Sequence, residues 1–241
     1  KIVIVYNPFL YFFNGGNALI EKVIVGADEA GRGLIIGPMI IGACAINEEI
    51  GKQFKKIDIK DSKKYSTIKK LFFHADIIKK QALAWSVKSI PADVLSSFNK
   101  NKMTMDEAEA YAFFRAIEEI SQKVPEINTY QVDNFQAVKK LEELLKQNLK
   151  TENTRLIVTT RAESKYIAVS AGSVLARAES LKELETLKKK YGDFGSGSTS
   201  DKKTIQWLKD YYTKNRNWPE KLVRTYWKTI TVIEKEFEKE R

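Results

Sequence analysis

The stretch Val-Gly-Ala-Asp-Glu-Ala-Gly-Arg-Gly, residues 25–33, decides the fold and indicates the chemistry of this chain. It completes an apolar run that predicts a buried strand over residues 23–28. Neighbouring strand residues point to opposite faces, so Asp28 and Glu29 can share a site only where the strand ends and its backbone bends. Two carboxylates attract a divalent cation, and the N–H groups and arginine of a Gly-Arg-Gly turn suit a phosphodiester or sugar hydroxyl. The stretch therefore predicts metal-assisted chemistry on a nucleic acid.

Composition supports this interpretation and narrows the alternatives. The chain has 241 residues, of which 43% are hydrophobic and 30% charged, as in an ordinary globular protein with one large core. Its formal net charge of +10 favours a polyanionic partner, although many basic proteins bind no nucleic acid. The single cysteine, Cys44, excludes an intramolecular disulfide and fits a reducing, cytoplasmic setting. With His74 as the single histidine, the sequence disfavours zinc sites and Cys-His or Ser-His-Asp catalysis, which leaves carboxylates, lysines, hydroxyls or a hard metal.

Hydrophobic periodicity predicts an α/β domain with a mixed sheet. Strands are expected at residues 23–28, 37–46, 82–90, 129–133 and 155–160. Helices are expected at residues 66–80, 104–121, 135–149, 172–190, 201–214 and 221–238. We expect residues 1–22 to be an extension, either strand–turn–strand or disordered, and no membrane span because Asn, Pro and Gly interrupt its uncharged stretch. Residues 23–241 are then one catalytic domain, including C-terminal helices from about residue 201.

Two more acids follow predicted strands. Asp133 ends the strand at 129–133, and Glu163 follows the strand at 155–160. Sites in open α/β sheets collect beyond the carboxyl ends of strands, where Asp28 and Glu29 also lie. A lone acid there is ordinarily a cap or turn residue, whereas four converging carboxylates cannot coexist without cations. Spacing alone does not show that they converge.

Several motifs together resemble the type 2 ribonucleases H, the ribonuclease HII and HIII family. They are the opening stretch through Gly37-Pro38, Lys-Asp-Ser-Lys-Lys at 60–64, the segment 162–177, Tyr-Gly-Asp-Phe-Gly-Ser-Gly at 191–197 and Val-Arg-Thr-Tyr-Trp-Lys-Thr at 223–229. The resemblance spans about residues 23–230. It implies a ribonuclease H-like fold, with a mixed central sheet flanked by helices and a helical C-terminal region.

The resemblance also implies the site. Its catalytic and metal-binding acids are Asp28, Glu29, Asp133 and Glu163. The backbone of Gly31, Arg32 and Gly33 would read 2′-hydroxyl groups, which distinguish RNA from DNA. Asp28 would bridge two ions, Glu29 and Asp133 would complete the shell of one, and Glu163 would hold the other.

The implied activity is endonucleolytic hydrolysis of the RNA strand of RNA–DNA hybrids with two Mg²⁺ or Mn²⁺ ions, giving 5′-phosphate and 3′-hydroxyl ends. We expect a cytoplasmic monomer without an obligate protein partner. One alternative is a hybrid-binding module that has lost catalysis. Another is a different nuclease or a transposase on the same fold, which cutting of all-DNA duplex would indicate.

Departures from the family pattern refine these expectations. Glu163 stands where ribonucleases HII usually carry aspartate and HIII glutamate, while the Gly-Arg-Gly turn is HII-like. Ser198 stands where HII usually has a tyrosine that stacks on the nucleotide at an RNA–DNA junction, and a serine has no aromatic face. We therefore expect single embedded ribonucleotides to be cut poorly. Among many basic residues, Lys63 and Arg224 are predicted to contact phosphate.

Overall fold

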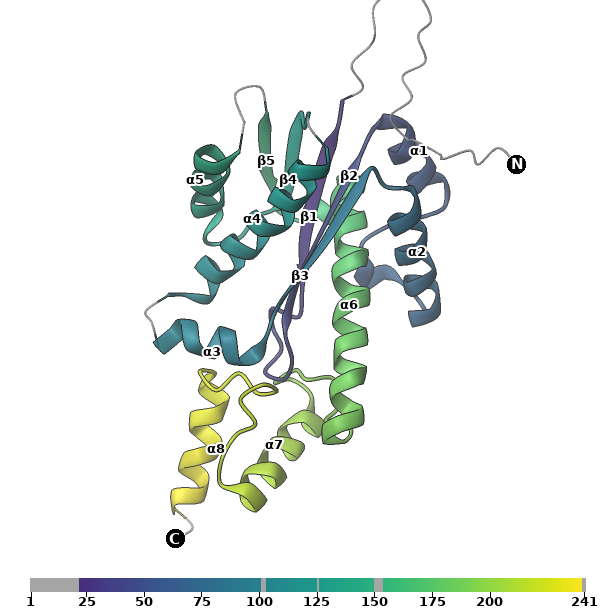
Figure 1. Cartoon of the computed structure of the whole chain (residues 1–241). Helices are drawn as coiled ribbons and strands as arrows, with labels where there is room; N and C mark the ends of the chain where they lie inside the picture. The colour runs from purple at the N-terminus through teal and green to yellow at the C-terminus, as the bar shows by residue number, and fades with distance from the viewer. Residues whose placement is uncertain (1–21, 101–102, 125, 150–153, 240–241) are drawn as a thin grey trace, which may run out of the picture.

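The structure is a computed structural model that describes residues 22–100, 103–124, 126–149 and 154–239. The predicted extension therefore lies, apart from Lys22, outside the described residues. Five strands form one sheet in the order β3-β2-β1-β4-β5 (Figure 1). The strands are β1 (Ile24–Ala30), β2 (Met39–Ile46), β3 (Ala84–Ile90), β4 (Thr129–Asp133) and β5 (Arg155–Thr159). The helices are α1 (Glu48–Lys56), α2 (Ile68–Gln81), α3 (Ala92–Lys100), α4 (Met105–Lys123), α5 (Val138–Asn148), α6 (Ile167–Tyr191), α7 (Lys202–Asn215) and α8 (Lys228–Lys239).

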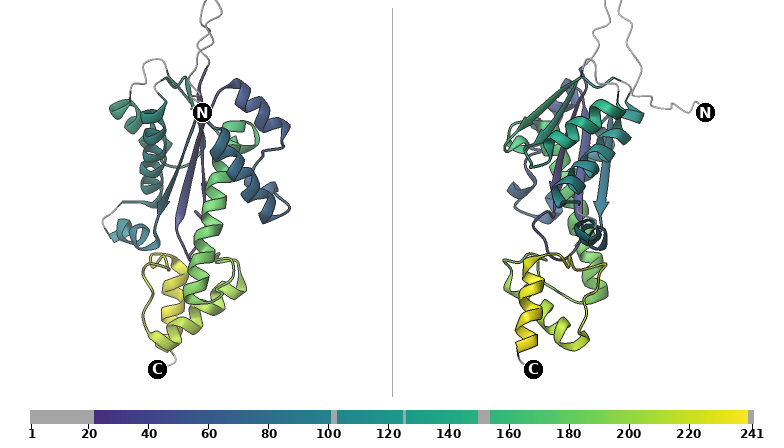
Figure 2. Two further views of the ribbon diagram at one scale, coloured as in Figure 1. Left: turned by 45° about the vertical axis from the view of Figure 1, so that its right-hand side comes forward. Right: turned by 90° about the vertical axis from the view of Figure 1, so that its left-hand side faces the viewer.

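The sheet is mixed, as predicted. β1, β2 and β3 pair antiparallel, whereas β1, β4 and β5 pair parallel. Helices α4 and α5 pack on one face, and α6, flanked by α1 and α2, packs on the other (Figures 1 and 2). This arrangement is the expected α/β sandwich, and both faces of the sheet are covered by apolar cores.

Helix α6 lies unusually close to β1 and β2 because glycine faces glycine at the contact. A Cβ at Gly42 would lie 2.3 Å from the carbonyl oxygen of Gly172, and one at Gly26 would lie 2.2 Å from the backbone of Ala168. Small residues on α6 allow its backbone to rest directly on the strands. The helix therefore carries its polar residues up to the strand that holds Asp28.

Beyond the sheet, α7 and α8 form a separate helical cluster at the far end of α6 (Figure 2). The β1–β2 connection passes into this cluster, where Ile35 and Ile36 are fully buried. Two isolated β-bridges tie it there, Leu34 to Ser198 and Ile36 to Val223. The C-terminal region is thus joined to the segment that follows Asp28 and Glu29.

Most predicted elements are confirmed, but β1 continues through Asp28 and Glu29 to Ala30 rather than ending at residue 28, and α6 begins at Ile167 rather than at residue 172. Helices α1 and α3 were not predicted, and α8 begins at Lys228 rather than at residue 221. Residues 222–224 instead lie buried against the β1–β2 connection. No helix among the described residues is long and apolar enough to cross a membrane.

Candidate active site

Asp28 and Asp133 follow the last paired residues of two parallel strands, Asp28 inside β1 and Asp133 at the carboxyl end of β4. Pairing of β1 with β4 runs from Ile24–Thr129 to Ala27–Val132, so these two aspartates are the next residues on each strand. Residues opposite each other in a parallel pair point to the same face of the sheet. β1 continues to Ala30 paired only with β2, which leaves its β4 side open from Asp28 onward.

Asp28 is buried on the α6 face, with 7% of its surface exposed. Burial, followed by the charge of Glu29 and a hydrogen-bonding contact with it, raises the pKa of Asp28 well above its usual range. A contact with Ser173 of α6 opposes this shift, and the Ser173 hydroxyl lies 2.8 Å from that of Ser62. An electrostatically strained acid pair of this kind is typical of sites that bind a cation or a proton.

Glu163 lies in a 3₁₀ helix, η2 (Ala162–Ser164), between β5 and α6. Its Oε2 atom is buried and has no hydrogen-bond partner. Burial raises the pKa of Glu163, the nearby charges of Asp133 and Asp61 raise it further, and that of Lys63 opposes them. Glu163 is therefore within electrostatic reach of Asp133, and its unpartnered oxygen favours a cationic neighbour.

The structure places Asp28 in contact with Glu29 and Glu163 within electrostatic reach of Asp133, but it does not form a finished ligand cage from the four predicted acids. Within the residues that the structure describes, no three acidic, histidine or cysteine side chains are close enough together to hold an ion. The donor chemistry nevertheless fits a hard divalent cation, since all four groups are carboxylates and Glu163 Oε2 is unpartnered.

The Gly31–Gly33 turn follows β1 directly. Gly31 has φ +78°, and a Cβ there would meet the Pro38 carbonyl oxygen at 2.7 Å, so glycine is required by the chain itself. Gly33 differs, because a Cβ there would meet no atom within 4 Å. Neither packing nor a positive φ within the chain requires glycine at position 33.

The side chain of Arg32 turns away from this open surface. Its Nε donates to Glu109 Oε2 at 3.0 Å, and its Nη2 pairs with Asp106, both on α4. The backbone of Arg32, rather than its guanidinium, is therefore the part presented by the turn.

The predicted phosphate contact of Arg224 is wrong. Its side chain is fully buried, and burial lowers its pKa to about 10. Its guanidinium donates to three backbone carbonyls of the β1–β2 connection, those of Gly31, Arg32 and Gly37. The sequence alone suggests an exposed charge at Arg224, whereas the fold buries this side chain.

Comparison with known proteins identifies the chain. Residues 25–230 match the family model of Ribonuclease HII. The chain belongs to the ribonuclease HII family. It is accordingly a type 2 ribonuclease H, an enzyme class that acts on RNA–DNA hybrids. The Ribonuclease HII of Methanocaldococcus jannaschii is 34% identical over 226 residues, covering 88% of this chain and 94% of that relative.

Solved structures of related enzymes have the same fold as this chain. The ribonuclease H2 of Pyrococcus horikoshii OT3 superposes with a TM-score of 0.79 at 33% identity, covering 90% of this chain and all of the other. The ribonuclease HII of Archaeoglobus fulgidus, solved in complex with PCNA, gives 0.73 at 28% identity, with 87% and 96% covered. A Bst ribonuclease HIII, solved with Mn²⁺, gives 0.78 at 18% identity, with 92% and 71% covered, which shows the shared fold alone.

In the present chain, a basic hollow of about 150 Å³ lies beside the acids. Its lining contains the exposed Lys63, Arg177 of α6 and the polar Ser62, Tyr65 and Thr67, together with the apolar Ile68, Leu71 and Leu181. Lys63 also reaches the acids electrostatically, because its charge opposes the raised pKa of Glu163. The two cations in this lining, Lys63 and Arg177, are the residue types that bind phosphate.

Ser198 stands beside the turn, where its backbone bridges to Leu34 and its hydroxyl lies 2.9 Å from that of Ser200.

The site also contains residues that were not predicted: Asp61, Glu109, Ser173 and Arg177. Asp61 belongs to the motif at 60–64, and Ser173 and Arg177 belong to the motif at 162–177, so these motifs could have indicated them. Nothing in the sequence indicated Glu109, because only the fold brings α4 to the turn.

Proposed function

We propose that this ribonuclease HII hydrolyses the RNA strand of RNA–DNA hybrids with two divalent ions, Mg²⁺ or Mn²⁺, leaving 5′-phosphate and 3′-hydroxyl ends. The observation that carries the proposal is the placement of Asp28 beside Asp133 at the open edge of β1. Glu163 stands within electrostatic reach of Asp133, with one oxygen unpartnered. Carboxylates in such a cluster repel one another unless cations neutralise them.

Asp28, Glu29, Asp133 and Glu163 would hold the ions. Bound there, the two ions would supply activation of the attacking water and charge stabilisation at the phosphate and leaving oxygen. Ser173 restrains the buried Asp28 carboxylate, and α6 fixes Ser173 through its glycine contact with the sheet. The acids are thus positioned before substrate arrives, which lowers the cost of ordering them during the reaction.

Substrate binding would involve two surfaces on either side of the acids. Lys63, with Arg177, binds a phosphate in the basic hollow. The exposed backbone at Gly31–Gly33 approaches the sugar edge of the RNA strand, and Gly33 supports this because no contact within the chain requires its missing side chain. Contact with a 2′-hydroxyl at this point selects RNA over DNA.

Serine at position 198 would make the enzyme a poor cutter of single ribonucleotides. Ser198 lies next to the turn through Leu34, but its hydroxyl cannot stack on a base. Loss of a base–aromatic stack weakens binding by about 1–3 kcal/mol.

We further propose that residues 23–241 act as one catalytic domain, cytoplasmic and monomeric, without an obligate protein partner. The A. fulgidus relative forms a complex with PCNA, so a sliding clamp is a candidate for a non-obligate partner.

The test compares three duplexes of one sequence, an RNA/DNA hybrid, a single ribonucleotide within DNA, and all DNA, each with Mg²⁺ and with Mn²⁺. Asp133→Asn serves as the inactive variant and Asp76→Asn, an exposed aspartate of α2, as the matched control. We expect the wild type and Asp76→Asn to cut the hybrid, Asp133→Asn to cut nothing, and neither active protein to cut all DNA. Tight hybrid binding without cleavage would instead support a catalytically silent binding module.

A further inference from the structure

The Gly31–Gly33 turn is held from one side by the fully buried Arg224. Its Nη2 donates to the carbonyl of Gly31 at 2.7 Å, its Nη1 to that of Arg32 at 3.0 Å, and its Nε to that of Gly37 at 2.9 Å. In a trans peptide the N–H points opposite to the C=O of the same unit, and the described residues contain no cis peptide. The N–H groups of Arg32 and Gly33 therefore point away from the guanidinium.

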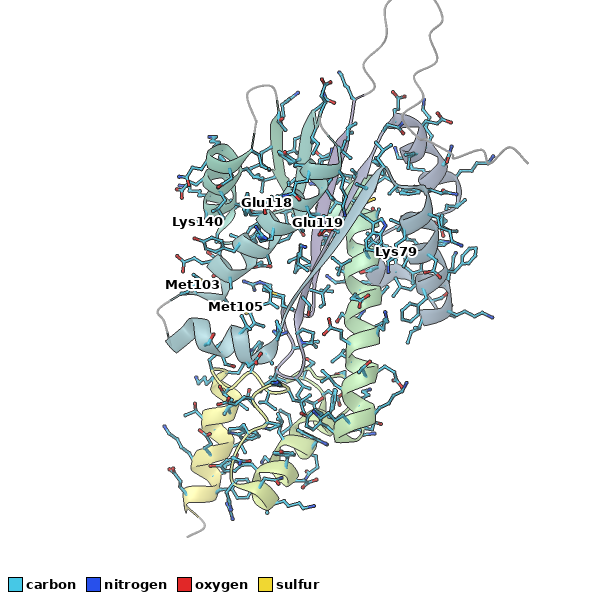
Figure 3. The ribbon with its side chains drawn as sticks, in the orientation of Figure 1. Lys79, Met103, Met105, Glu118, Glu119 and Lys140 are labelled. Atoms are coloured by element: carbon cyan, nitrogen blue, oxygen red, sulfur yellow. The ribbon has the colours of Figure 1, made fainter. Side chains whose placement is uncertain are left out.

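Glu109 holds the same turn from the opposite element. Its side chain is fully buried on α4, its Oε2 accepts the Arg32 Nε at 3.0 Å, and its Oε1 has no partner. Figure 3 labels Met105 at the start of this helix, and the Tyr226 hydroxyl donates to the Met105 sulfur at 3.0 Å. The segment that carries Arg224 is thus tied to the helix that carries Glu109.

Burying two ionisable side chains to hold a surface turn costs desolvation free energy. Burial lowers the pKa of Arg224 to about 10 and raises that of Glu109 to about 7. Replacing buried ionic groups with apolar ones is often neutral or stabilising, so stability alone does not account for them. What the two side chains do fix is the orientation of the peptide units that face the open surface.

We propose that Arg224 and Glu109 are positioning residues that clamp the Gly31–Gly33 turn so that the N–H groups of Arg32 and Gly33 face the RNA strand. Neither side chain contacts substrate. The clamp sets discrimination between hybrid and DNA duplex through the turn, and it rests on the proposed role of that turn in hybrid recognition.

The experiment uses the full chain with Glu109→Gln, Arg224→Lys and Arg224→Met. Glu118→Gln, a surface change on the same helix (Figure 3), is the matched control. Binding of the hybrid and of all-DNA duplex is measured without divalent metal by fluorescence anisotropy, KM and kcat are measured on the hybrid, and thermal melting reports folding. Because each N–H that no longer faces the RNA strand loses a hydrogen bond to it, we expect about tenfold weaker hybrid binding.

Four results are expected together. Affinity for DNA duplex stays nearly constant, KM rises in step with the lost hybrid affinity, kcat changes little, and Arg224→Lys recovers part of what Arg224→Met loses. A merely structural role would instead lower melting temperature and active fraction with KM and the hybrid-to-DNA ratio unchanged, which would overturn the proposal. If Arg224→Met does not fold, Glu109→Gln decides the matter.

The controls separate this proposal from the function on which it rests. If the wild type cuts and prefers the hybrid while folded variants keep that preference, only the clamp is wrong. If the wild type neither cuts the hybrid nor prefers it to DNA, the proposed function fails and the clamp fails with it.

Discussion

At the scale of the residue, Gly33 is the most direct test of the recognition surface. We expect Gly33→Ala to fold and melt like the wild type, because a Cβ there meets nothing within 4 Å and the residue has no positive φ. Hybrid affinity should fall by about tenfold or more, since the added methyl group occupies the path of the RNA strand. The control is Gly51→Ala on α1, whose Cβ would make ordinary contacts at 3.4 and 3.5 Å. Unchanged hybrid binding by Gly33→Ala would show that the substrate approaches elsewhere.

Asp28 connects the charge of the site to the stability of the metal-free chain. Because burial and Glu29 raise its pKa, folded Asp28 keeps a proton at pH values where the unfolded chain, with a pKa of about 3.9, has lost it. The free energy of unfolding should therefore fall as pH rises from about 4 through the raised pKa, and the full penalty remains above it.

Asp28→Asn should remove that penalty and abolish cleavage. We expect it to unfold about 2–4 °C higher than the wild type at pH 7 without metal, for a gain of about 1 kcal/mol. Thermal melts across pH 4–8 would show the two proteins converging at low pH. A lower melting temperature for the variant at neutral pH would mean that Ser173 and the backbone stabilise the carboxylate more than burial penalises it.

Lys63 tests the basic hollow. Neutralising it in Lys63→Gln should weaken binding equally across hybrid sequences and reduce the slope of log affinity against log salt by about one unit. Lys64→Gln is the matched control, because Lys64 is an exposed neighbour that does not line the hollow. Equal slopes for wild type and Lys63→Gln would argue against a phosphate contact.

At the scale of the element, the contact of α6 with β1 and β2 supports the whole site. Gly42→Ala would push a methyl group to 2.3 Å from the Gly172 carbonyl oxygen, which α6 can relieve only by moving away from the sheet. We expect a loss of about 3 kcal/mol, or roughly 6–12 °C in melting temperature, measured beside Gly51→Ala. Activity should fall in the folded fraction as well, because Ser173 moves with α6. Retention of wild-type stability would mean that the helix can shift without cost.

An element can be predicted from the sequence when the residues that it buries form a clear apolar pattern along the chain. The strand at 129–133 was predicted to the residue. Helix α1 was not predicted because it is mostly charged, contains Gly51 and buries only that residue and Phe54. The helix predicted from residue 221 starts later because the backbone of residues 222–224 pairs with the β1–β2 connection, a contact distant in sequence.

The candidate site was predictable in kind but not in detail. Acids at strand ends could be found from the chain, since the carboxyl edge of a parallel pair is a general position for sites. The burial of Arg224 could not be predicted from the chain. The backbone carbonyls that accept its hydrogen bonds belong to residues nearly 200 positions earlier. Glu109 is hidden for the same reason, since its partner is supplied by tertiary packing.

At the scale of the whole molecule, the sheet carries the acids, and the C-terminal region carries the Ser198 loop that lies beside the Gly31–Gly33 turn. The two are joined where Ile35 N–H donates to the Gly197 carbonyl at 2.8 Å and Gly37 N–H to that of Leu222 at 2.8 Å. The loop that carries Ser198 is therefore held against the turn that we propose reads the RNA strand. Substrate preference should depend on this shared surface rather than on the acids.

Ser198→Tyr should consequently change which substrate is cut without changing the chemistry. An aromatic face beside Leu34 could stack on a junction nucleotide, and a stack contributes about 1–3 kcal/mol, or roughly 5- to 150-fold. We expect cleavage of a single embedded ribonucleotide to rise by about tenfold relative to the hybrid. Ser200→Tyr, exposed on the same loop, should leave that ratio as it is in the wild type. An equal gain from both tyrosines would indicate nonspecific stacking, and no gain from either would mean that position 198 does not face the junction.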